Sequence, residues 1–472
     1  MSSALPRVII VGAGPAGTRC AETLLAAGIR PTVIDEGRRD GGQIYRRQPP
    51  AFTRSYQTLY GTEASRAEAL HRTFDKLREQ IDYRPETLAW NISERQLHIA
   101  AGTRPSALPF DALVICSGAA DRIMPVKGWH FAGTYTLGGA QIALKSQACA
   151  IGRNVVFMGT GPLLYLIASQ YLKAGVKVAA VLDTSPWRLR MAALAKLLTR
   201  PSLLYNGILM TTALKRAGIP LYNGIEPLEI RGTAEAGVQD LSFRDAAGHT
   251  HTIACDAVAL GYHVRPETQL ADLARCEFRY EARTRQWLPV IDADGRSSVA
   301  GVYLAGDGAY VRGADAAETA GRLAALAVLQ DLGRPVDAGA MAGMQTRLAK
   351  MGRFGQGLAQ AFPWPAQQAH RLPDDAMLCR CEAISVGELR RVVVDKGAIE
   401  ANRAKALSRI GMGRCQGRYC GHAAAEIIAH AASIPLEQVG RLRGQAPVKP
   451  LSMAMENTQE DRNSSTGAPL EA

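Results

Sequence analysis

A glycine-rich turn between a hydrophobic strand and a helix is the feature of this sequence that most restricts its fold. The apolar run at residues 8–11 leads directly into Gly12-Ala13-Gly14-Pro15-Ala16-Gly17, with the glycines spaced G-x-G-x-x-G. In this pattern the first glycine permits a tight turn, the second lets the backbone approach a pyrophosphate, and the third lets helix and strand pack closely. The phosphates then lie at the helix N-terminus, which favours anions. The sequence therefore predicts a Rossmann-like unit whose cofactor contacts Gly12, Gly14, Pro15, Ala16 and Gly17.

The chain repeats this pattern 147 residues later. Residues 155–164 read Val-Val-Phe-Met-Gly-Thr-Gly-Pro-Leu-Leu, and the strand at 110–118 returns at 255–261. Two similar βαβ domains in tandem are the simplest explanation. The second loop keeps Gly159 and Gly161 but has Leu164 in place of the third small residue. We expect this loop either to hold NAD(P) poorly, with Asp183 near the ribose, or to act only as scaffold.

Two further segments extend the predicted nucleotide site. The strand at 32–34 ends in Asp35-Glu36, at about the spacing of a ribose-binding carboxylate. We favour Glu36, because strand alternation puts it on the side opposite Asp35 and it is last before Gly37. The following Gly41-Gly42-Gln43 turn would let a ligand lie against the backbone, so Gly42 and Gln43 are predicted contacts; an ordinary surface turn is the alternative.

Gly306 and Asp307 complete the predicted site. They follow an apolar strand and open an Ala-rich helix that ends near Pro335. An aspartate there can accept hydrogen bonds from a ribityl hydroxyl, although helix N-caps are often Asp for structural reasons alone. This strand and helix would return the chain to the first domain, with the second domain inserted within it.

The sequence thus predicts an α/β protein with two Rossmann-like domains, one inserted in the other, and a small helical C-terminal domain. Our boundaries are 1–120 for the first part of the first domain, 121–254 for the second domain, and 255–335 for the return. Residues 336–375 are expected to form a helical linker, and 376–445 the C-terminal domain. Residues 446–472 lose apolar periodicity and are expected to be disordered.

Four of the nine cysteines crowd into the C-terminal domain, as Cys379-x-Cys381 and Cys415-x4-Cys420. Four thiolates brought together hold zinc or an iron–sulfur cluster. The one-residue spacing of the first pair suits a [2Fe-2S] cluster better than a zinc knuckle, but zinc and an unmetallated site stay open. No cysteine pair accompanies either glycine-rich loop, so no redox disulfide is expected beside a flavin. Nor does a nucleophile–histidine arrangement indicate catalytic residues.

Charge and hydropathy restrict the possible binding partners and cellular location of the protein. The net charge is +12, but no run of five or more basic residues occurs, which disfavours nucleic acid and leaves an acidic protein partner or anionic lipid. No apolar stretch approaches the roughly 18 residues of a membrane span. We expect a cytoplasmic protein, in which the five lone cysteines stay reduced, with peripheral contact to the inner membrane face as an option.

With these residues in place, the chain resembles two-dinucleotide-domain flavoproteins of the pyridine nucleotide–disulfide oxidoreductase class. Its C-terminal part resembles the [2Fe-2S] domain of bacterioferritin-associated ferredoxin. The combination, with Gly41-Gly42-Gln43-Ile44-Tyr45-Arg46 and the motif at 415–420, looks most like the α subunit of the opine oxidase family. That family includes subunits of octopine, nopaline and (hydroxy)proline dehydrogenases and the B subunit of hydrogen cyanide synthase.

The resemblance implies an electron-transfer subunit of a flavin-dependent amino-acid or opine dehydrogenase. It implies FAD or another adenine nucleotide in the first site, FMN at a subunit interface, and a [2Fe-2S] cluster on the four cysteines. It also implies a β subunit similar to D-amino-acid oxidases, which oxidises the substrate, and in some members a small ferredoxin-like γ subunit. The alternatives are a self-contained NAD(P)H-dependent flavoprotein reductase and a zinc-containing redox- or iron-responsive binding protein. Leu164 and the missing disulfide argue against NAD(P)H reductase activity.

Overall fold

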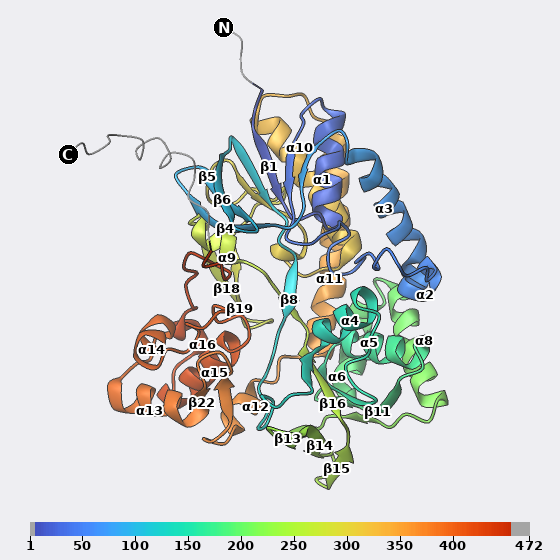
Figure 1. Ribbon diagram of the computed structural model, residues 1–472, viewed down its shortest axis with the longest axis vertical. Helices are drawn as coiled ribbons and strands as arrows, with labels where there is room; N and C mark the ends of the chain where they lie inside the picture. The colour runs from blue at the N-terminus through green and yellow to red at the C-terminus, as the bar shows by residue number, and fades with distance from the viewer. Residues whose placement is uncertain (1–4, 455–472) are drawn as a thin grey trace, which may run out of the picture.

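The computed structural model describes residues 5–454 and consists of two parallel α/β sheets and a small helical C-terminal domain (Figure 1). The predicted fold class is thereby confirmed. The first sheet has the order β20-β7-β1-β2-β3 and is parallel throughout. Its strands are β20 (Val302–Leu304), β7 (Ala112–Ile115), β1 (Val8–Val11), β2 (Thr32–Ile34) and β3 (Asp82–Arg84).

Both faces of this sheet are covered, which explains why β1 and β7 are apolar at every position. One face packs against α1 (Pro15–Ala26), α3 (Ala64–Leu77) and α10 (Ala314–Asp331). The other face packs against the meander β4 (Thr87–Ser93), β5 (Gln96–Ala101) and β6 (Arg104–Pro109) and against α9 (Gln269–Leu273). Helices α1 and α10 approach so closely that a Cβ on Gly321 would stand 2.0 Å from the Ala16 carbonyl oxygen.

The second sheet has the order β12-β11-β10-β16-β9 and is also parallel. These strands are β12 (Leu221–Asn223), β11 (Lys177–Asp183), β10 (Asn154–Thr160), β16 (Ala257–Tyr262) and β9 (Thr134–Thr136). One face packs against α4 (Leu137–Ser146), α5 (Pro162–Lys173) and α8 (Pro201–Arg216). The other lies against β13 (Glu226–Thr233), β14 (Gly237–Arg244) and β15 (Thr250–Ala254).

The chain crosses between the two sheets on a pair of short antiparallel strands. It leaves through β8 (Ala119–Asp121) and returns through β17 (Val264–Pro266), which pairs with β8. The predicted return at residue 255 is therefore wrong by several residues. Strand β16 is buried at all six positions and needs β10 and β9 on its two sides, so it belongs to the second sheet.

Helices then lead to the C-terminal domain. The segment 336–375 contains α11 (Ala338–Ala361) and α12 (Ala366–Arg371), and α11 packs against α10, α6 (Trp187–Ala192) and α7 (Leu194–Leu197), so it contacts both sheet domains. The C-terminal domain comprises β21 (Met377–Cys379), β22 (Ile384–Ser385), α13 (Val386–Lys396), α14 (Ala401–Ser408), α15 (Gly421–Ala432) and α16 (Leu436–Val439). Ser385 and Glu388 form a capping box that fixes where α13 begins.

The predicted start of the disordered tail is too early. Val448 is buried in the core of the first domain, and its N–H donates to the Trp90 carbonyl oxygen at 3.2 Å. Val448 lies between prolines at 447 and 450, where no helical or strand periodicity is present, so the sequence could not reveal this contact. The rest of the predicted tail, residues 455–472, lies outside the described residues.

Candidate functional site

The glycine-rich loop closes between β1 and α1 in a shape that only glycine allows. Gly12 has φ +108°, and a Cβ there would stand 2.3 Å from the Cys116 carbonyl oxygen. A Cβ on Gly17 would stand 1.8 Å from the Gly12 carbonyl oxygen. Pro15 opens α1, where its missing N–H costs nothing, and Ala16 is buried beneath the loop. The backbone N–H groups at the start of α1 are thus arranged to receive an anion.

A second glycine turn faces this loop. The Gly41 N–H donates to the Ala13 carbonyl oxygen at 2.9 Å, and a Cβ on Gly14 would lie 3.5 Å from the Gly42 Cα. Side chains at either position would fill the space between the two turns. The arrangement is a cradle with backbone walls, which fits the pyrophosphate of a dinucleotide. Gln43 follows on the exposed rim, where its Oε1 accepts from Arg46 at 2.7 Å.

The two acidic residues after β2 have different surroundings. The Asp35 carboxylate accepts from the Ala13 N–H at 2.5 Å and from the Gly37 N–H at 2.6 Å, so it braces the glycine-rich loop. Burial raises the pKa of the Asp35 carboxyl above its usual value. Glu36 is exposed and pairs with Lys449 at the rim. Glu36 thus lies at the solvent-exposed rim of the cradle, and its role in binding a ribose stays a prediction.

Gly306 and Asp307 lie against the start of α1. A Cβ on Gly306 would stand 2.9 Å from the Ala16 Cβ. Asp307 Oδ1 accepts from the N–H groups of Arg312 and Gly313, at 2.9 and 3.1 Å, immediately before α10. Burial raises the pKa of this carboxyl. The strand end, the turn and two helix N-termini therefore meet at one edge of the first sheet, where open α/β sheets bind ligands.

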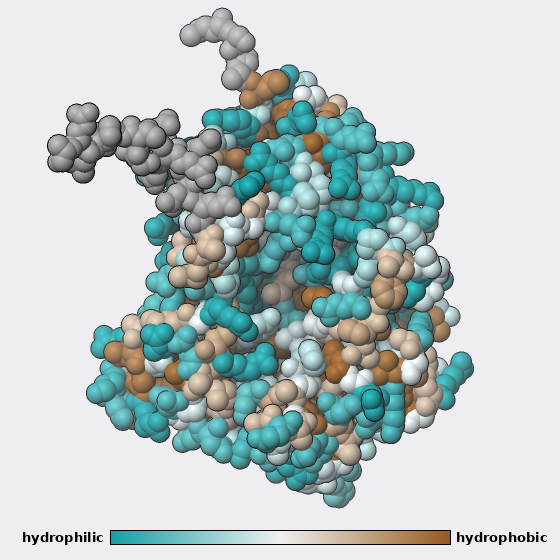
Figure 2. Space-filling view, viewed as in Figure 1, coloured by the Kyte–Doolittle hydropathy of each residue, from teal (hydrophilic) through white to brown (hydrophobic). Residues whose placement is uncertain are grey.

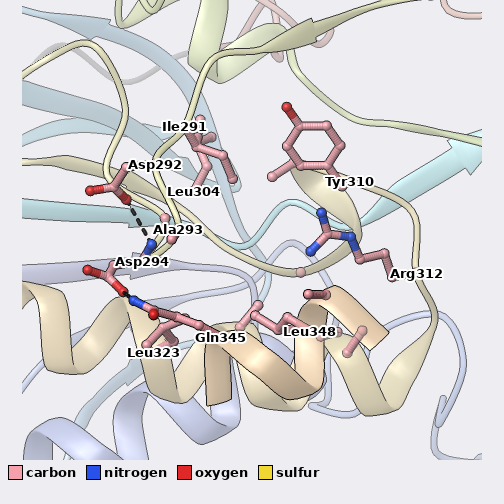
Figure 3. Close-up of a pocket in the computed structure, with 17 residues that line it drawn as sticks. Ile291, Asp292, Ala293, Asp294, Leu304, Tyr310, Arg312, Leu323, Gln345 and Leu348 are labelled. Atoms are coloured by element: carbon pink, nitrogen blue, oxygen red, sulfur yellow. Dashed lines mark hydrogen bonds between the residues drawn. The ribbon is translucent and has the colours of Figure 1, made fainter. Parts of the chain in front are cut away.

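A cavity of 330 Å³ adjoins this edge. It lies between the turn at 291–295, α10 and α11, and the side chains of Tyr310 and Arg312 point into it (Figure 3). The Arg312 guanidinium stands 5.1 Å from the centre of the Tyr310 ring, and the Gln345 amide donates to Asp294 at 2.6 Å on the opposite side. Gly306 and Arg312 line this cavity, so the cavity lies next to the candidate site.

Two cations, Lys145 and Arg46, lie beside the cradle. The sequence did not indicate either of them as a ligand-binding residue. Lys145, on α4 of the second domain, is 5% exposed, and its ammonium donates to the Ile44 carbonyl oxygen at 3.2 Å. Burial and the charge of Arg46 lower the pKa of Lys145 to about 8. Among residues 5–454 neither cation forms an ion pair with a carboxylate, and the Arg46 Nε is buried without a hydrogen-bond partner. Neighbouring cations that form no direct ion pair favour an anionic ligand.

The equivalent site in the second domain is filled by the chain itself. Asp183, where a ribose would be held, is fully buried and accepts from Tyr165 Oη, Thr160 Oγ1 and Arg190 Nη2, at 2.8, 3.0 and 2.7 Å. A Cβ on Gly161 would stand 3.0 Å from the His263 ring, and His263 Nε2 donates to the Phe362 carbonyl oxygen at 2.6 Å. The acceptors and the space that a second dinucleotide needs are therefore occupied.

The four clustered cysteines are brought together from two loops. Cys379 ends β21 and Cys420 precedes α15; both are buried, whereas Cys381 is exposed and Cys415 is half-buried. The thiols lie close enough to affect one another's pKa: Cys420 acts on Cys379 and Cys415, and Cys415 acts on Cys381. Within residues 5–454, no three or more His, Cys, Asp or Glu side chains gather around a single metal-ion position. Two pairs of thiolates on two irons need no such common centre.

The surroundings favour thiolates at two of these positions. Hydrogen bonds from the Cys420 thiol, with backbone N–H groups nearby, lower the pKa of Cys379 to about 6 and that of Cys415 to about 5. Cys420 lies between these two sulfurs, and its pKa is raised. Thiolates are the form that binds iron. The donor set fits a [2Fe-2S] cluster.

The cysteine loop contacts the first domain directly. Arg418 forms an ion pair of 2.7 Å with Glu267, and the Gln269 amide donates to the Gln416 carbonyl oxygen at 2.9 Å. Glu267 in turn accepts at its carbonyl oxygen from Ser117 Oγ at 2.6 Å. Ser117 Oγ would stand 2.6 Å from a Cβ on Gly308, next to Asp307. These contacts connect the cysteine site, through Glu267 and Ser117, to the candidate nucleotide site.

Comparison with known proteins agrees with both sites. Residues 6–327 match the pyridine nucleotide-disulphide oxidoreductase family, and residues 377–430 match the BFD-like [2Fe-2S] binding domain. In the part of the chain that the structure describes, all nine cysteines are free, so the disulfide of the family name has no counterpart here.

The similar proteins align over nearly the whole chain. The A subunit of opine oxidase from Rhizobium meliloti is 37% identical over 95% of this chain and 86% of its own length. Hydrogen cyanide synthase subunit HcnB from Pseudomonas aeruginosa is 30% identical over 94% of this chain and 97% of its own length. Among solved structures, L-proline dehydrogenase from P. horikoshii has the same fold, with a TM-score of 0.70 at 17% identity over 96% of this chain and 80% of that chain. The chain therefore belongs to the pyridine nucleotide-disulphide oxidoreductase family, among relatives of the opine oxidase A subunit, and carries a C-terminal BFD-like [2Fe-2S] domain.

Proposed function

We propose that this chain is the electron-transfer subunit of a heteromeric flavin-dependent dehydrogenase that oxidises a C–N bond in an amino acid or opine. One observation carries the proposal: the loop between Cys415 and Cys420 contacts Glu267 and Gln269 of the first domain. Glu267 in turn is hydrogen-bonded to Ser117, which lies against the turn beside Asp307 in the candidate nucleotide site. The names of the similar proteins support it, since opine oxidase and hydrogen cyanide synthase are built from subunits. Substrate oxidation is assigned to a partner subunit that resembles D-amino-acid oxidases.

The residues divide between two cofactors. Gly12, Gly14, Gly17 and Gly42 would cradle the phosphates of FAD or a shorter adenine nucleotide, with Pro15, Ala16, Gln43 and Gly306 around them, and Glu36 and Asp307 would bind hydroxyl groups. Cys379, Cys381, Cys415 and Cys420 would ligate the irons. A flavin accepts two electrons and releases them singly to a one-electron cluster. The protein's part is to fix the distance between the sites through Arg418 and Glu267. An FMN site would lie at the interface with the partner.

The final acceptor in this proposal is not NAD(P). The acceptor groups of Asp183 are already taken by Tyr165 and Arg190, and Leu164 is buried where the third small residue would stand. Rapid mixing of the flavin-loaded protein with NADH or NADPH tests this point. We expect no bleaching of the flavin; fast bleaching would favour the self-contained reductase instead.

Reconstitution tests the assembly. We expect the purified chain alone to oxidise no amino acid or opine, and activity with an artificial electron acceptor to arise when a D-amino-acid-oxidase-like subunit is co-expressed. A small ferredoxin-like subunit would raise the yield of the complex. Robust turnover by the single chain would contradict the proposal, and so would failure to bind both flavin and iron.

We also place the protein in the cytoplasm, with peripheral contact to the inner membrane face. The net charge of +12 without an extended basic run supports an anionic surface as its target.

A further inference from the structure

We propose that helices α6, α7 and α8 form a docking surface for an anionic lipid bilayer. Their exposed face carries seven large apolar side chains: Trp187, Met191, Leu194, Leu198, Tyr205, Ile208 and Leu209. We call this set the 187–209 face. In Figure 2 brown and tan side chains gather at the lower right of the molecule, where Figure 1 places α6 and α8. An apolar group of this kind on a soluble domain marks an interaction site.

The spacing shows that these side chains belong to one surface. Residues 187, 191, 194 and 198 follow the i, i+4, i+7, i+11 spacing of one helical face across α6 and α7. On α8, residues 205, 208 and 209 repeat the pattern, whereas Leu214 points inward and is fully buried. The opposite sides pack against α5 and α11. The helices are therefore held rigidly while their apolar stripes project outward.

The charges around the 187–209 face indicate what binds to it. Residues 184–225 contain six Lys or Arg and no Asp or Glu, and α11, which packs against α6 and α7, adds three cations and again no acid. Within the described chain, no carboxylate pairs with Arg188, Lys215 or Arg216. A protein partner usually presents both signs of charge at its rim, whereas a bilayer rich in acidic lipids is uniformly negative. Apolar side chains among unpaired cations are the pattern of interfacial helices.

The position of the face agrees with this role. In Figure 1, α8 and the C-terminal domain lie on opposite sides of the lower half of the molecule, so lipid contact at α8 would not involve the C-terminal domain. None of the helices within residues 5–454 is both long and apolar enough to cross a bilayer. Contact would therefore be peripheral.

Vesicle flotation of the full chain provides the test. We expect the protein to float with vesicles of phosphatidylglycerol and phosphatidylcholine, to float far less with phosphatidylcholine alone, and to be released by high salt. Leu198→Gln with Ile208→Gln should lower the partition coefficient about tenfold. Lys215→Glu with Arg216→Glu should lower it about tenfold for the anionic vesicles only.

Leu407→Gln is the matched control, because Leu407 on α14 is 51% exposed and Leu198 is 54% exposed. It should leave flotation unchanged. Equal flotation of the wild type and the L198Q/I208Q variant would overturn the proposal. It would also be overturned if that variant changed the oligomeric state or the binding of a partner subunit but not flotation, since the face would then be a protein interface. Flavin and iron content, measured on the same samples, keep this outcome separate from failure of the electron-transfer proposal.

Discussion

Arg418 Nε lies 2.7 Å from Glu267 Oε2, and this ion pair joins the cysteine loop to the first domain. Both side chains are largely buried. Burial alone would raise the pKa of the Glu267 carboxyl, but the charges of Arg265 and Arg418 lower it below its usual value. The carboxylate therefore stabilises the native state at neutral pH, and this contribution is lost as the pH falls through the lowered pKa.

Replacing Arg418 by glutamine should loosen this junction. Glu267 would keep only its longer contact with Arg265, at 3.5 Å, and losing one partner of a buried ion pair costs up to about 3 kcal/mol. We therefore expect a lower midpoint in thermal unfolding and slower reduction of the cluster by the flavin. Arg371→Gln is the control, since its pair with Glu226 is exposed and exposed pairs contribute less than about 1 kcal/mol. Equal stability of the two variants would refute a joining role for Arg418.

Two glycine variants separate folding from cofactor binding. Gly14→Ala places a Cβ at an ordinary 3.5 Å from Gly42 and needs no strained backbone, so the protein should fold while nucleotide affinity falls on the order of tenfold. Gly17→Ala drives a Cβ into the Gly12 carbonyl oxygen and should prevent folding. Circular dichroism and flavin titration of both variants check this contrast; full flavin affinity in G14A would show that the cradle is not used.

The cysteine site predicts a clear difference between two thiols. Cys415→Ser should abolish the red-brown colour and lower bound iron from about two atoms per chain to near zero, because each iron needs two thiolates. Cys149→Ser removes an exposed thiol outside the site and should change neither. Anaerobic purification followed by iron analysis and visible spectroscopy provides the measurement. One zinc ion per chain in the wild type would contradict the assignment.

Lys145 predicts a pH dependence of nucleotide binding. Its ammonium is charged below a pKa of about 8 and neutral above it, so affinity for a phosphate-bearing ligand should fall as the pH rises through this value. Lys145→Gln should bind about tenfold more weakly at neutral pH, since hydrogen bonds to charged groups contribute about 1.5 kcal/mol or more. The variant should also lose the pH dependence, whereas Lys145→Arg should stay bound at high pH. Flavin fluorescence titration across this range decides.

Local motifs account for what the sequence could predict. The glycine spacing at 12–17 and the paired cysteines depend on neighbours a few residues apart, so the Rossmann-like strands and the grouping of four thiols follow from short segments. Long-range contacts could not be foreseen in this way. Lys145 reaches the cradle from a different domain, and Arg190 fills the second site from a helix beyond β11. The boundary at 254 failed because one buried strand resembles another until its sheet partners are known.

The site around Asp183 and Gly161 in the second domain, which the chain itself fills, has a consequence for making truncated forms of this protein. Arg190, from one domain, and Phe362, from the segment before the cysteines, meet at a distance of 4.9 Å between guanidinium and ring centre. A truncated chain that ended at residue 335 would lack Phe362. It would expose to solvent Arg190 and His263, which contact Phe362 in the full chain. The domains of this protein are thus not independent folding units. The segment before the C-terminal domain completes the core of the second domain, so we expect only the full chain to fold correctly.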